Sequence, residues 1–453
     1  MASLPILTIL EESRVSPPLA TVGNRSLPLT FSDFKWLTFN PVHTLLFYEL
    51  PISKTQFTET IVPRLKSSLS ITLQHFFPYV GNLIVYPTSP TKKPEILYVE
   101  GDFVAFTYAK CNLDFTDLTG NHPRNCENFY SLIPVLTCTS NKESDFISIP
   151  VFSVQVTVFP NCGFSIGMTC HHSIGDASSH FLFLKAWTSI SQSDTHDLLL
   201  VNGTLPIYDR LVKYPKLDEC FLKNAKLETF YQDYKPPILS GPSDKVRSTF
   251  ILTQIVINQL KKTVFNQLPT IPYISSFTVA CGYIWSCMAE SRNDELQLFC
   301  FCIDCRARMD PPIPAAYFGN CVIPCKTIEK TVLLKGKEGF VNATKLLGEN
   351  LNKILGDKDG VVNDRLAFND SVANGMLTTS IGVAGTPKLK FYDLDFGWGK
   401  PRKYETISID YDESISMNCC KELNEGLEIG VSLSANEMEA FIRVFNHGLK
   451  AYI

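Results

Sequence analysis

Two stretches of alternating residues, joined by a short turn, constrain the fold of this 453-residue chain more than any other feature. Residues 152–158 and 164–172 each carry an apolar side chain at every second position, and a turn-forming run with Pro, Asn and Gly lies between them. Because side chains on a strand point alternately to opposite faces, the pattern predicts an antiparallel hairpin with one apolar face. A helical pattern follows over residues 176–190. The sequence therefore predicts a sheet covered by helices.

Strand and helix patterns alternate along the rest of the chain, which is typical of a mixed α/β fold. Between residues 189 and 246 the periodicity fades and five prolines interrupt the chain, so we interpret residues 191–245 as a connection between domains. This division gives an N-terminal domain over residues 1–190 and a C-terminal domain over residues 246–453. The other main predicted elements are helices over 53–77, 251–268 and 275–291, and strands over 95–99, 103–108 and 298–304.

Composition and charge argue against several classes of protein. Hydrophobic residues make up 45% of the chain and charged residues 19%, which suits well-packed cores. Lys and Arg number 41 and Asp and Glu 45, so the net charge of −4 gives no reason to expect nucleic acid as a partner. The N-terminus lacks the basic start and cleavage site of a secretory signal, and the longest apolar run, over residues 277–289, is shorter than the ~20 residues of a membrane span. These two observations predict a cytoplasmic protein with no membrane partner. In such a protein the fifteen cysteines, which have no regular spacing, are expected to be reduced thiols.

The stretch TCHHSIGDAS, residues 169–178, holds two adjacent histidines and an aspartate. Strand alternation places His172 at the end of the apolar face and His171 among small polar residues on the opposite face. An imidazole held rigidly at the end of a strand is a candidate general base, because its ordinary pKa of ~6.5 suits proton transfer near neutral pH. The pattern alone leaves open that His172 is a core residue and that Asp176 only caps the following helix.

Other kinds of site are disfavoured. Adjacent histidines on a strand point in opposite directions, so His171 and His172 cannot readily hold one metal ion. The sequence has no G-x-S-x-G nucleophile elbow, no phosphate-binding G-x-x-x-x-G-K-[ST] and no convincing G-x-G-x-x-G. If His172 acts as a base, it deprotonates a substrate hydroxyl for direct attack, without a covalent enzyme intermediate.

Three motifs occur in order along the chain. HSIGD at residues 172–176 matches an HxxxD motif, YFGNC occupies residues 317–321, and DFGWG occupies residues 395–399. In these motifs, their order and their spacing, the full chain resembles the plant BAHD acyltransferases, in particular the branch that acylates anthocyanin and flavonoid glycosides. The resemblance implies two chloramphenicol-acetyltransferase-like domains of mixed α/β structure. A long crossover loop would join them, with a central channel between them and some strands exchanged between the two domains.

The resemblance also implies an activity. The expected reaction moves malonyl from malonyl-CoA to a sugar hydroxyl of an anthocyanin or flavonoid glucoside, in particular the 6″-hydroxyl of an anthocyanin 3-O-glucoside, in a ternary complex. Malonyl-CoA is then a co-substrate, no metal or tightly bound cofactor is expected, and the enzyme is expected to be a monomer. Two alternatives stay open: transfer of acetyl or hydroxycinnamoyl groups, and a non-catalytic relative that binds CoA thioesters.

Matching positions give each site residue a role under this resemblance. His172 is the general base, and Asp176 pairs with Arg306 to support its loop. Asp395 is grouped with His172 as catalytic, although its glycine-rich surroundings favour a structural role. The residues expected to bind malonyl-CoA are Lys261, Lys262, Ser275 and Ser276.

The acyl group sets a further requirement. A pocket for malonyl must compensate the free carboxylate when it leaves water. His180, on the same face of the predicted helix as Asp176, is the candidate for this contact, and Lys185 is the alternative.

The sequence departs from the family in one respect. Relatives often carry a hydroxyl residue just before the V-A-G stretch, here at residues 383–385, where it stabilises the tetrahedral oxyanion. This chain has Ile381 and Gly382 there, so Ser380 or a backbone N–H is expected to supply the donor.

Overall fold

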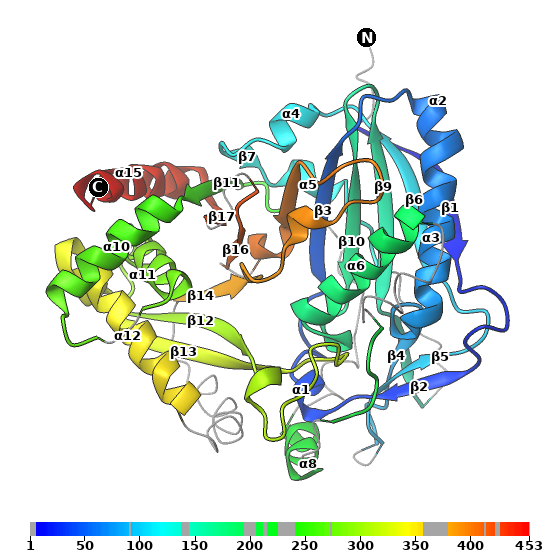
Figure 1. Ribbon diagram of the computed structural model, residues 1–453, viewed down its shortest axis with the longest axis horizontal. Helices are drawn as coiled ribbons and strands as arrows, with labels where there is room; N and C mark the ends of the chain where they lie inside the picture. The colour runs from blue at the N-terminus through cyan, green and yellow to red at the C-terminus, as the bar shows by residue number, and fades with distance from the viewer. Residues whose placement is uncertain are drawn as a thin grey trace.

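The computed structural model describes residues 6–89, 92–136, 145–193, 205–211, 215–224, 241–271, 274–356, 379–411, 414–421 and 426–452. Within these ranges the chain forms two parts that lie side by side (Figure 1). The first part holds a six-stranded and a four-stranded sheet, and the second holds a seven-stranded sheet. Most of the predicted connection at residues 191–245 lies outside the described residues, so the domain limits at 190 and 246 stay a prediction.

The predicted hairpin forms the centre of the six-stranded sheet. β9 (Phe152–Phe159) and β10 (Gly163–Cys170) pair antiparallel, which confirms the hairpin. β10 ends at Cys170, two residues earlier than predicted, because His171 leaves the strand to cap a 3-10 turn. The strand order is β1 (Leu7–Val15), β6 (Val104–Cys111), β9, β10, β3 (Val42–Glu49) and β15 (Lys403–Thr406).

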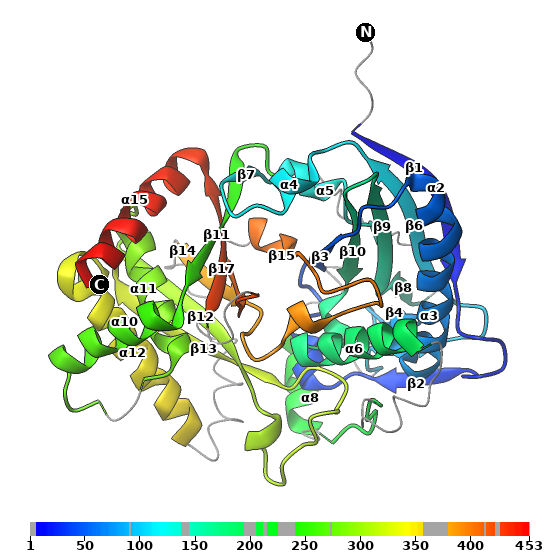
Figure 2. The same cartoon turned by 45° about the horizontal axis from the view of Figure 1, so that its top comes forward.

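Both faces of this hairpin are buried. The apolar side chains of β10 pack in one core with α3 (Val62–His75) and α6 (Ala177–Ser193), as the alternation predicted. Figure 2 shows these two helices side by side against the sheet. On the other face, a Cβ on Gly167 would lie 2.1 Å from the carbonyl oxygen of Leu132. The small residues of β10 therefore let another segment of main chain lie directly on the sheet.

The seven-stranded sheet and its helices form the second part. The predicted helix at 275–291 is confirmed as α11 (Ser276–Ala289). The one predicted at 251–268 begins later, as α10 (Gln254–Gln267), because the chain up to residue 252 continues a strand and Thr253 caps the helix. α12 (Gly336–Gly356) and α15 (Ala435–Tyr452) complete the helices of this part. The strand order is β13 (Val322–Lys330), β12 (Leu296–Asp304), β14 (Thr379–Ala384), β16 (Ile415–Cys419), β17 (Leu427–Ser434), β11 (Lys245–Leu252) and β7 (Arg124–Asn125).

Each part contributes a strand to the other part's sheet. β7, from the first third of the chain, pairs with β11 at the edge of the seven-stranded sheet. β15, from near the end of the chain, pairs with β3 at the edge of the six-stranded sheet. This exchange interlocks the two parts through backbone hydrogen bonds.

A buried group of charges lies where the exchanged strands meet. Arg124 Nη1 lies 2.7 Å from Glu405 Oε1. Arg247 lies 3.3 Å from the other oxygen of Glu405 and 3.4 Å from Asp410. Although burial raises the pKa of Glu405, the neighbouring cations lower it to about 2. The Glu405 cluster, as we call it, comprises Arg124, Arg247, Lys403, Glu405, Asp410 and Glu428, all with buried side chains.

The remaining elements belong to the first part and to the region between the two. The predicted helix at 53–77 is confirmed as α2 (Lys54–Gln56), a π-helical turn (Phe57–Ile61) and α3. α8 (Pro215–Asn224) lies within the predicted connection, and its Asp218 accepts a 2.8 Å hydrogen bond from the N–H of Phe31. The other elements are α1 (Phe31–Phe34), β2 (Arg25–Pro28), β5 (Glu95–Tyr98), β4 (Asn82–Val85), β8 (Ile147–Pro150), α4 (Phe115–Leu118) and α5 (Glu127–Tyr130).

Candidate active site

His172 lies just beyond the end of β10, as the first residue of a 3-10 turn (His172–Ile174). His171 precedes the turn, and its Nδ1 accepts a hydrogen bond from the Ser173 N–H and lies 2.8 Å from the Ser173 hydroxyl. His171 is buried, and these contacts with Ser173 stabilise the turn. His172 is only partly buried, which leaves its ring within reach of a ligand.

Asp176 both caps α6 and pairs with Arg306. Its Oδ1 accepts a 3.1 Å hydrogen bond from the N–H of Ser179, as an N-cap does. Arg306 donates to Oδ2 at 2.8 Å and to Oδ1 at 3.0 Å, which is the strong bidentate geometry of an Arg–carboxylate pair. The N–H of Cys321 donates to Oδ2 at 3.0 Å. Among the described residues these groups are the partners of the carboxylate, and the His172 imidazole is not one of them.

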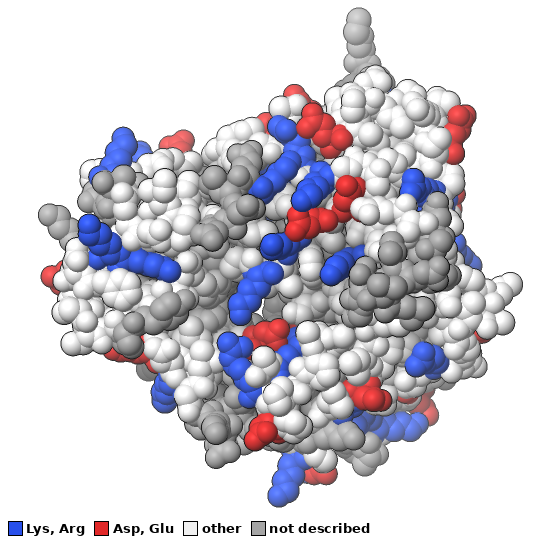
Figure 3. Space-filling view, viewed as in Figure 1, with Lys and Arg blue, Asp and Glu red and all other residues white. Residues whose placement is uncertain are grey.

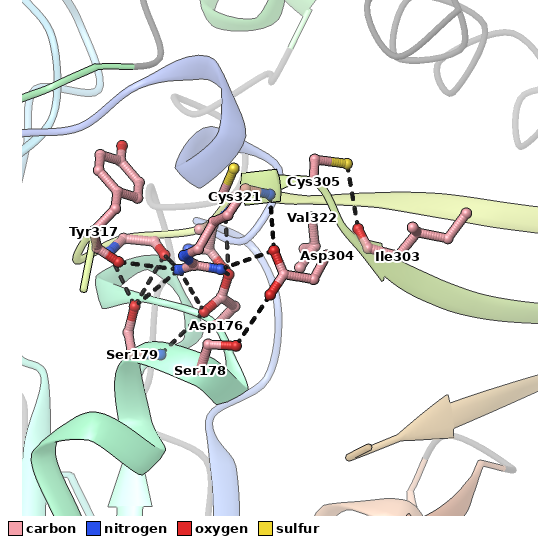
Figure 4. Close-up of polar contacts among 12 residues, drawn as sticks. Asp176, Ser178, Ser179, Ile303, Asp304, Cys305, Tyr317, Cys321 and Val322 are labelled. Carbon is pink, nitrogen blue, oxygen red and sulfur yellow. Dashed lines mark hydrogen bonds and ion pairs between the residues drawn. The ribbon is translucent and has the colours of Figure 1, made fainter. Parts of the chain in front are cut away.

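Arg306 extends this contact to the YFGNC segment. It donates to the carbonyl oxygens of Tyr317 and Gly319 at 3.1 and 3.0 Å. Figure 4 shows the carboxylate of Asp176 at the centre of these contacts, with Ser179, Tyr317 and Cys321 around it. Arg306 is 4% exposed, so its charge relies on these partners. We call Asp176, Ser179, Arg306 and Cys321 the Asp176 cluster.

Asn320, the fourth residue of the YFGNC motif, holds the main chain of His172. Its Nδ2 donates to the carbonyl oxygen of His172 at 3.0 Å and to Oδ1 of Asp33 at 3.0 Å. Its backbone N–H donates to the same Asp33 oxygen. The sequence analysis did not assign Asn320 to the site. The YFGNC motif was the signal that could have found it, but no local pattern pairs residue 320 with residue 172.

Two aromatic side chains from the segment after α1 cover the His172 ring. Trp36 stacks on the imidazole, with 3.7 Å between ring centroids and 6° between ring planes. Phe39 packs edge-on against the imidazole at 5.7 Å. The sequence analysis missed both residues, because they come from a part of the chain far from the HxxxD motif and follow no periodic pattern.

The surroundings keep His172 neutral. Burial, and to a smaller extent Lys35, lower the pKa of His172 to about 4, although its own carbonyl, Asp176 and Asn320 oppose this change. The imidazole is therefore unprotonated at neutral pH and can accept a proton. It is a weaker base than the ordinary histidine pKa would make it.

His180 lies on α6 beside the site. Its Nδ1 is 3.1 Å from the hydroxyl of Tyr79. Burial, and to a smaller extent His172, lower the pKa of His180 to about 4. His180 is therefore neutral at pH 7 in the substrate-free protein, and its contact with the malonyl carboxylate stays a prediction. Lys185, the alternative, is exposed on the same helix.

The four residues predicted to bind malonyl-CoA lie on two helices that pack against each other. Lys261 and Lys262 are on α10, the first half-buried and the second exposed. Ser275 caps α11, and its Oγ accepts a 3.0 Å hydrogen bond from the N–H of Thr278. Ser276 is the first residue of that helix, whose N-terminus favours an anion. Their role in binding CoA stays a prediction.

Asp395 lies at the opposite end of α6 from His172. Gln192, near the C-terminus of α6, donates to the carbonyl oxygen of Asp395 at 2.6 Å. α6 has 17 residues, so its two ends are about 25 Å apart. Oδ1 of Asp395 accepts hydrogen bonds from the N–H groups of Gly397 and Gly399, which have φ angles of 102° and 100° that favour glycine. The structure therefore contradicts the grouping of Asp395 with His172 as catalytic and indicates a role in shaping the DFGWG loop.

The stretch expected to hold the oxyanion donor lies on β14, between β12 and β16. Ser380 is exposed and Ile381 is buried. A Cβ on Gly382 would lie 2.6 Å from the hydroxyl oxygen of Ser414, so a larger residue there would require that hydroxyl to turn away. Which group binds the oxyanion stays a prediction.

No helix within the described ranges combines the length and apolar character needed to cross a bilayer. Over the same ranges, no three His, Cys, Asp or Glu side chains are grouped so that they could hold a metal ion.

Comparison with known proteins gives the class. The sequence profile of the Transferase family matches residues 6–447. The chain belongs to this family, the BAHD acyltransferases, which confirms the family, the fold class and the acyltransferase chemistry that the motifs predicted.

Individual relatives show which members of the family the chain is similar to. The chain is 52% identical to a malonyl-coenzyme A:anthocyanin 3-O-glucoside-6″-O-malonyltransferase of Dahlia pinnata, with 100% of both chains covered. It is 39% identical to a malonyl-coenzyme:anthocyanin 5-O-glucoside-6‴-O-malonyltransferase of Salvia splendens, with 98% of this chain and 96% of the relative covered. Among solved structures, vinorine synthase is similar over 96% of each chain, with a TM-score of 0.67 at 20% identity, which shows the shared fold.

Proposed function

We propose that the chain transfers malonyl from malonyl-CoA to the 6″-hydroxyl of an anthocyanin 3-O-glucoside. The Dahlia and Salvia relatives, both malonyltransferases that act on anthocyanin glucosides, support the acyl group and the acceptor class. The observation that carries the proposal is the neutral, partly exposed imidazole of His172, because it can act as a base although Asp176 is bonded elsewhere.

The negative charge of malonyl-CoA is complementary to cations at the junction of the two parts. On the face shown in Figure 3, Lys and Arg side chains lie along this junction around a hollow, with some Asp and Glu side chains among them. Malonyl-CoA carries several negative charges, and clustered cations raise the local concentration of such a ligand. We propose that Lys261, Lys262, Ser275 and Ser276 bind its CoA portion.

His172 acts as the general base. It removes the proton of the sugar hydroxyl while the oxygen attacks the thioester carbonyl carbon, and a new C–O bond forms. When the tetrahedral intermediate collapses, the C–S bond breaks and the imidazolium returns the proton to the sulfur of the departing CoA. The products are the malonyl ester and free CoA. Because Nδ1 of His172 is buried, Nε2 is the nitrogen that meets the substrate.

The surrounding residues fix the position of His172. The Asp176 cluster fixes the start of α6, and Asn320 holds the carbonyl of His172. His180, neutral and bonded to Tyr79, offers a hydrogen bond to the malonyl carboxylate. Ser380 or a backbone N–H of β14 stabilises the oxyanion. We further propose that the enzyme works in the cytoplasm as a monomer.

The test is turnover with malonyl-CoA and an anthocyanin 3-O-glucoside. His172→Ala should lower kcat by about 10²–10⁴-fold with little change in the free energy of unfolding. His122→Ala is the control, because His122 is exposed and its ring pairs with Asp117 at the surface. Near-normal turnover in His172→Ala would refute the mechanism. A preference of the wild-type enzyme for acetyl-CoA or coumaroyl-CoA would refute the choice of acyl group and leave the base in place.

A further inference from the structure

The indole of Trp36 lies flat on the imidazole of His172. The two rings are nearly parallel, at 6°, and their centroids are 3.7 Å apart, so their faces are in direct contact. Phe39 closes the stack edge-on, 5.1 Å from the Trp36 ring. Trp36 Nε1 is buried and has no hydrogen-bond partner among the described residues. Packing of the ring faces therefore sets the position of the indole, and its N–H does not.

This contact acts on a group that must become a cation during the reaction. Burial disfavours the imidazolium of His172. In a Ser-His-Asp triad a carboxylate bonded to the imidazole stabilises that cation. Here the carboxylate of Asp176 is bonded to Arg306 and to the N–H of Cys321, so it acts on His172 only from a distance.

The other titratable groups around the imidazole do not help the cation. Lys35 carries a positive charge and lowers the pKa of His172. Burial is the main cause that lowers the pKa of His171 and His180 to about 4, and a positive charge on His172 would oppose their protonation too, so both are neutral at pH 7.

We propose that the indole face of Trp36 stabilises the imidazolium of His172 by a cation–π interaction, in place of the carboxylate of a triad. The inference rests on the proposed function, because it assigns Trp36 a part in that proton transfer. It adds no bond to the reaction: the proton moves from the sugar hydroxyl to His172 and then to the CoA sulfur. Trp36 is a positioning residue that acts through His172.

Lys35 tests whether the pKa of His172 shifts in the direction that the proposal requires. Its Nζ lies 4.8 Å from the centroid of the Trp36 ring, and its charge acts on the same imidazole. The two residues are neighbours in sequence but have opposite effects. Removing the charge of Lys35 should raise the pKa of His172, whereas weakening the π face of Trp36 should lower it.

The first test replaces Trp36 site-specifically by mono-, di- and trifluorotryptophan, which withdraw charge from the π face and hardly change the shape. We expect kcat for malonyl transfer to fall with each fluorine, by about 2- to 30-fold over the series, the rate equivalent of a cation–π contact. KM for the acceptor should stay constant. The matched control is the same series at Trp398, a partly buried ring of the DFGWG loop that packs edge-on against Phe164 and has Arg64 over its face. Fluorination there also weakens a cation–π contact but should leave kcat unchanged.

The second test does not depend on turnover. NMR titration of the substrate-free enzyme, with the His172 signal identified from a His172→Asn variant, should show a lower His172 pKa with trifluorotryptophan at position 36 and a higher one in Lys35→Met. A kcat that does not respond to fluorination, or a His172 pKa that is unchanged by it, overturns the proposal and leaves Trp36 as packing. If the wild-type enzyme transfers no malonyl, the proposed function fails, while the titration still decides the role of Trp36.

Discussion

The Asp176 cluster and the Glu405 cluster are built from the same kind of interaction and serve different purposes. In both, a buried carboxylate receives a buried arginine from a distant part of the chain, Arg306 for Asp176 and Arg124 for Glu405. Both join residues from the first 180 positions to residues beyond 300. The Asp176 cluster ends at the turn that carries His172, whereas the Glu405 cluster lies between the two exchanged strands.

The difference shows that a buried ion pair is not itself a sign of a site. The Glu405 cluster places three cations beside three carboxylates, so its charges satisfy each other. In the Asp176 cluster the carboxylate also binds two backbone N–H groups, of Ser179 and Cys321, and so fixes the course of the chain beside the base. One cluster holds the two parts together, and the other holds one loop in position.

Arg247→Met tests this division with the largest expected effect. It leaves Glu405 and Asp410 buried without one of their cations, so the free energy of unfolding should fall by about 3–5 kcal/mol. The turnover of the protein that stays folded should remain within about twofold of wild type. Urea denaturation and kcat at a temperature well below the unfolding transition measure the two quantities.

Arg402→Met is the matched control for this substitution. Arg402 pairs with Glu49 where both side chains are substantially exposed, so the loss should stay below about 1 kcal/mol. A large loss of kcat in Arg247→Met without loss of stability would place the Glu405 cluster in the active site. The two clusters would then not have different roles.

Asp176→Asn and Arg306→Met should differ from Arg247→Met by lowering turnover in addition to stability, because this buried pair lies beside the base. Asn caps a helix about as well as Asp, so Asp176→Asn keeps the start of α6 but breaks the bidentate pair. We expect each variant to lose about 100-fold in kcat, because a small shift of a catalytic group has an effect of this size. The double variant should be little worse than either single one, since both break one contact. Fully additive losses in kcat would show that the two residues act independently.

The parts of this structure that follow from local pattern could be predicted from the sequence. Alternation located β9, β10 and α6, because one register buries the apolar face of the hairpin. The HxxxD motif located His172 and Asp176, and the resemblance supplied Arg306.

The rest depends on contacts between residues far apart in the chain. β7 and β15 are two and four residues long, too short for any periodicity, and their exchange depends on which edges are free in the folded protein. Trp36 and Asn320 reach His172 from separate segments. The alternation of residues located His172 at the correct end of the strand. It could not predict how deeply the side chain is buried, and burial is what lowers the pKa of His172.

Titration with acid separates the turn that carries His172 from the Glu405 cluster. Burial lowers the folded-state pKa of His171 to about 4, so between pH 6.5 and 4 the unfolded chain binds the proton first and stability falls as pH falls. The folded-state pKa of Glu405 is about 2, so its contribution is present above about pH 4.5 and is lost only below that. Between pH 7 and pH 5 the turn that carries His172 should therefore weaken first.

His171→Asn measures this effect. Asn keeps an acceptor for Ser173 but has no proton to bind. The stability lost between pH 7 and pH 5 should be smaller than in wild type by about 2 kcal/mol, measured by urea denaturation at both pH values. His122→Asn, at an exposed position, should leave the loss as in wild type. An unchanged loss in His171→Asn would mean that His171 is protonated in the folded protein at pH 5.

Asp395 supplies the smallest test, because its carboxylate could resemble either cluster. It is only partly buried and accepts hydrogen bonds from two N–H groups of its own loop. Asp395→Ala should lower the free energy of unfolding by about 1–2 kcal/mol through these lost bonds, with kcat per folded molecule unchanged, since the loop is a helix length from His172. Asp395→Asn keeps the acceptor oxygen and should lose less. Asp393→Ala, which breaks an exposed pair with Lys400 in the same segment, should lose less than about 1 kcal/mol. If Asp395→Asn kept its stability and lost its turnover, Asp395 would act on the reaction directly, and the DFGWG loop would belong with the Asp176 cluster.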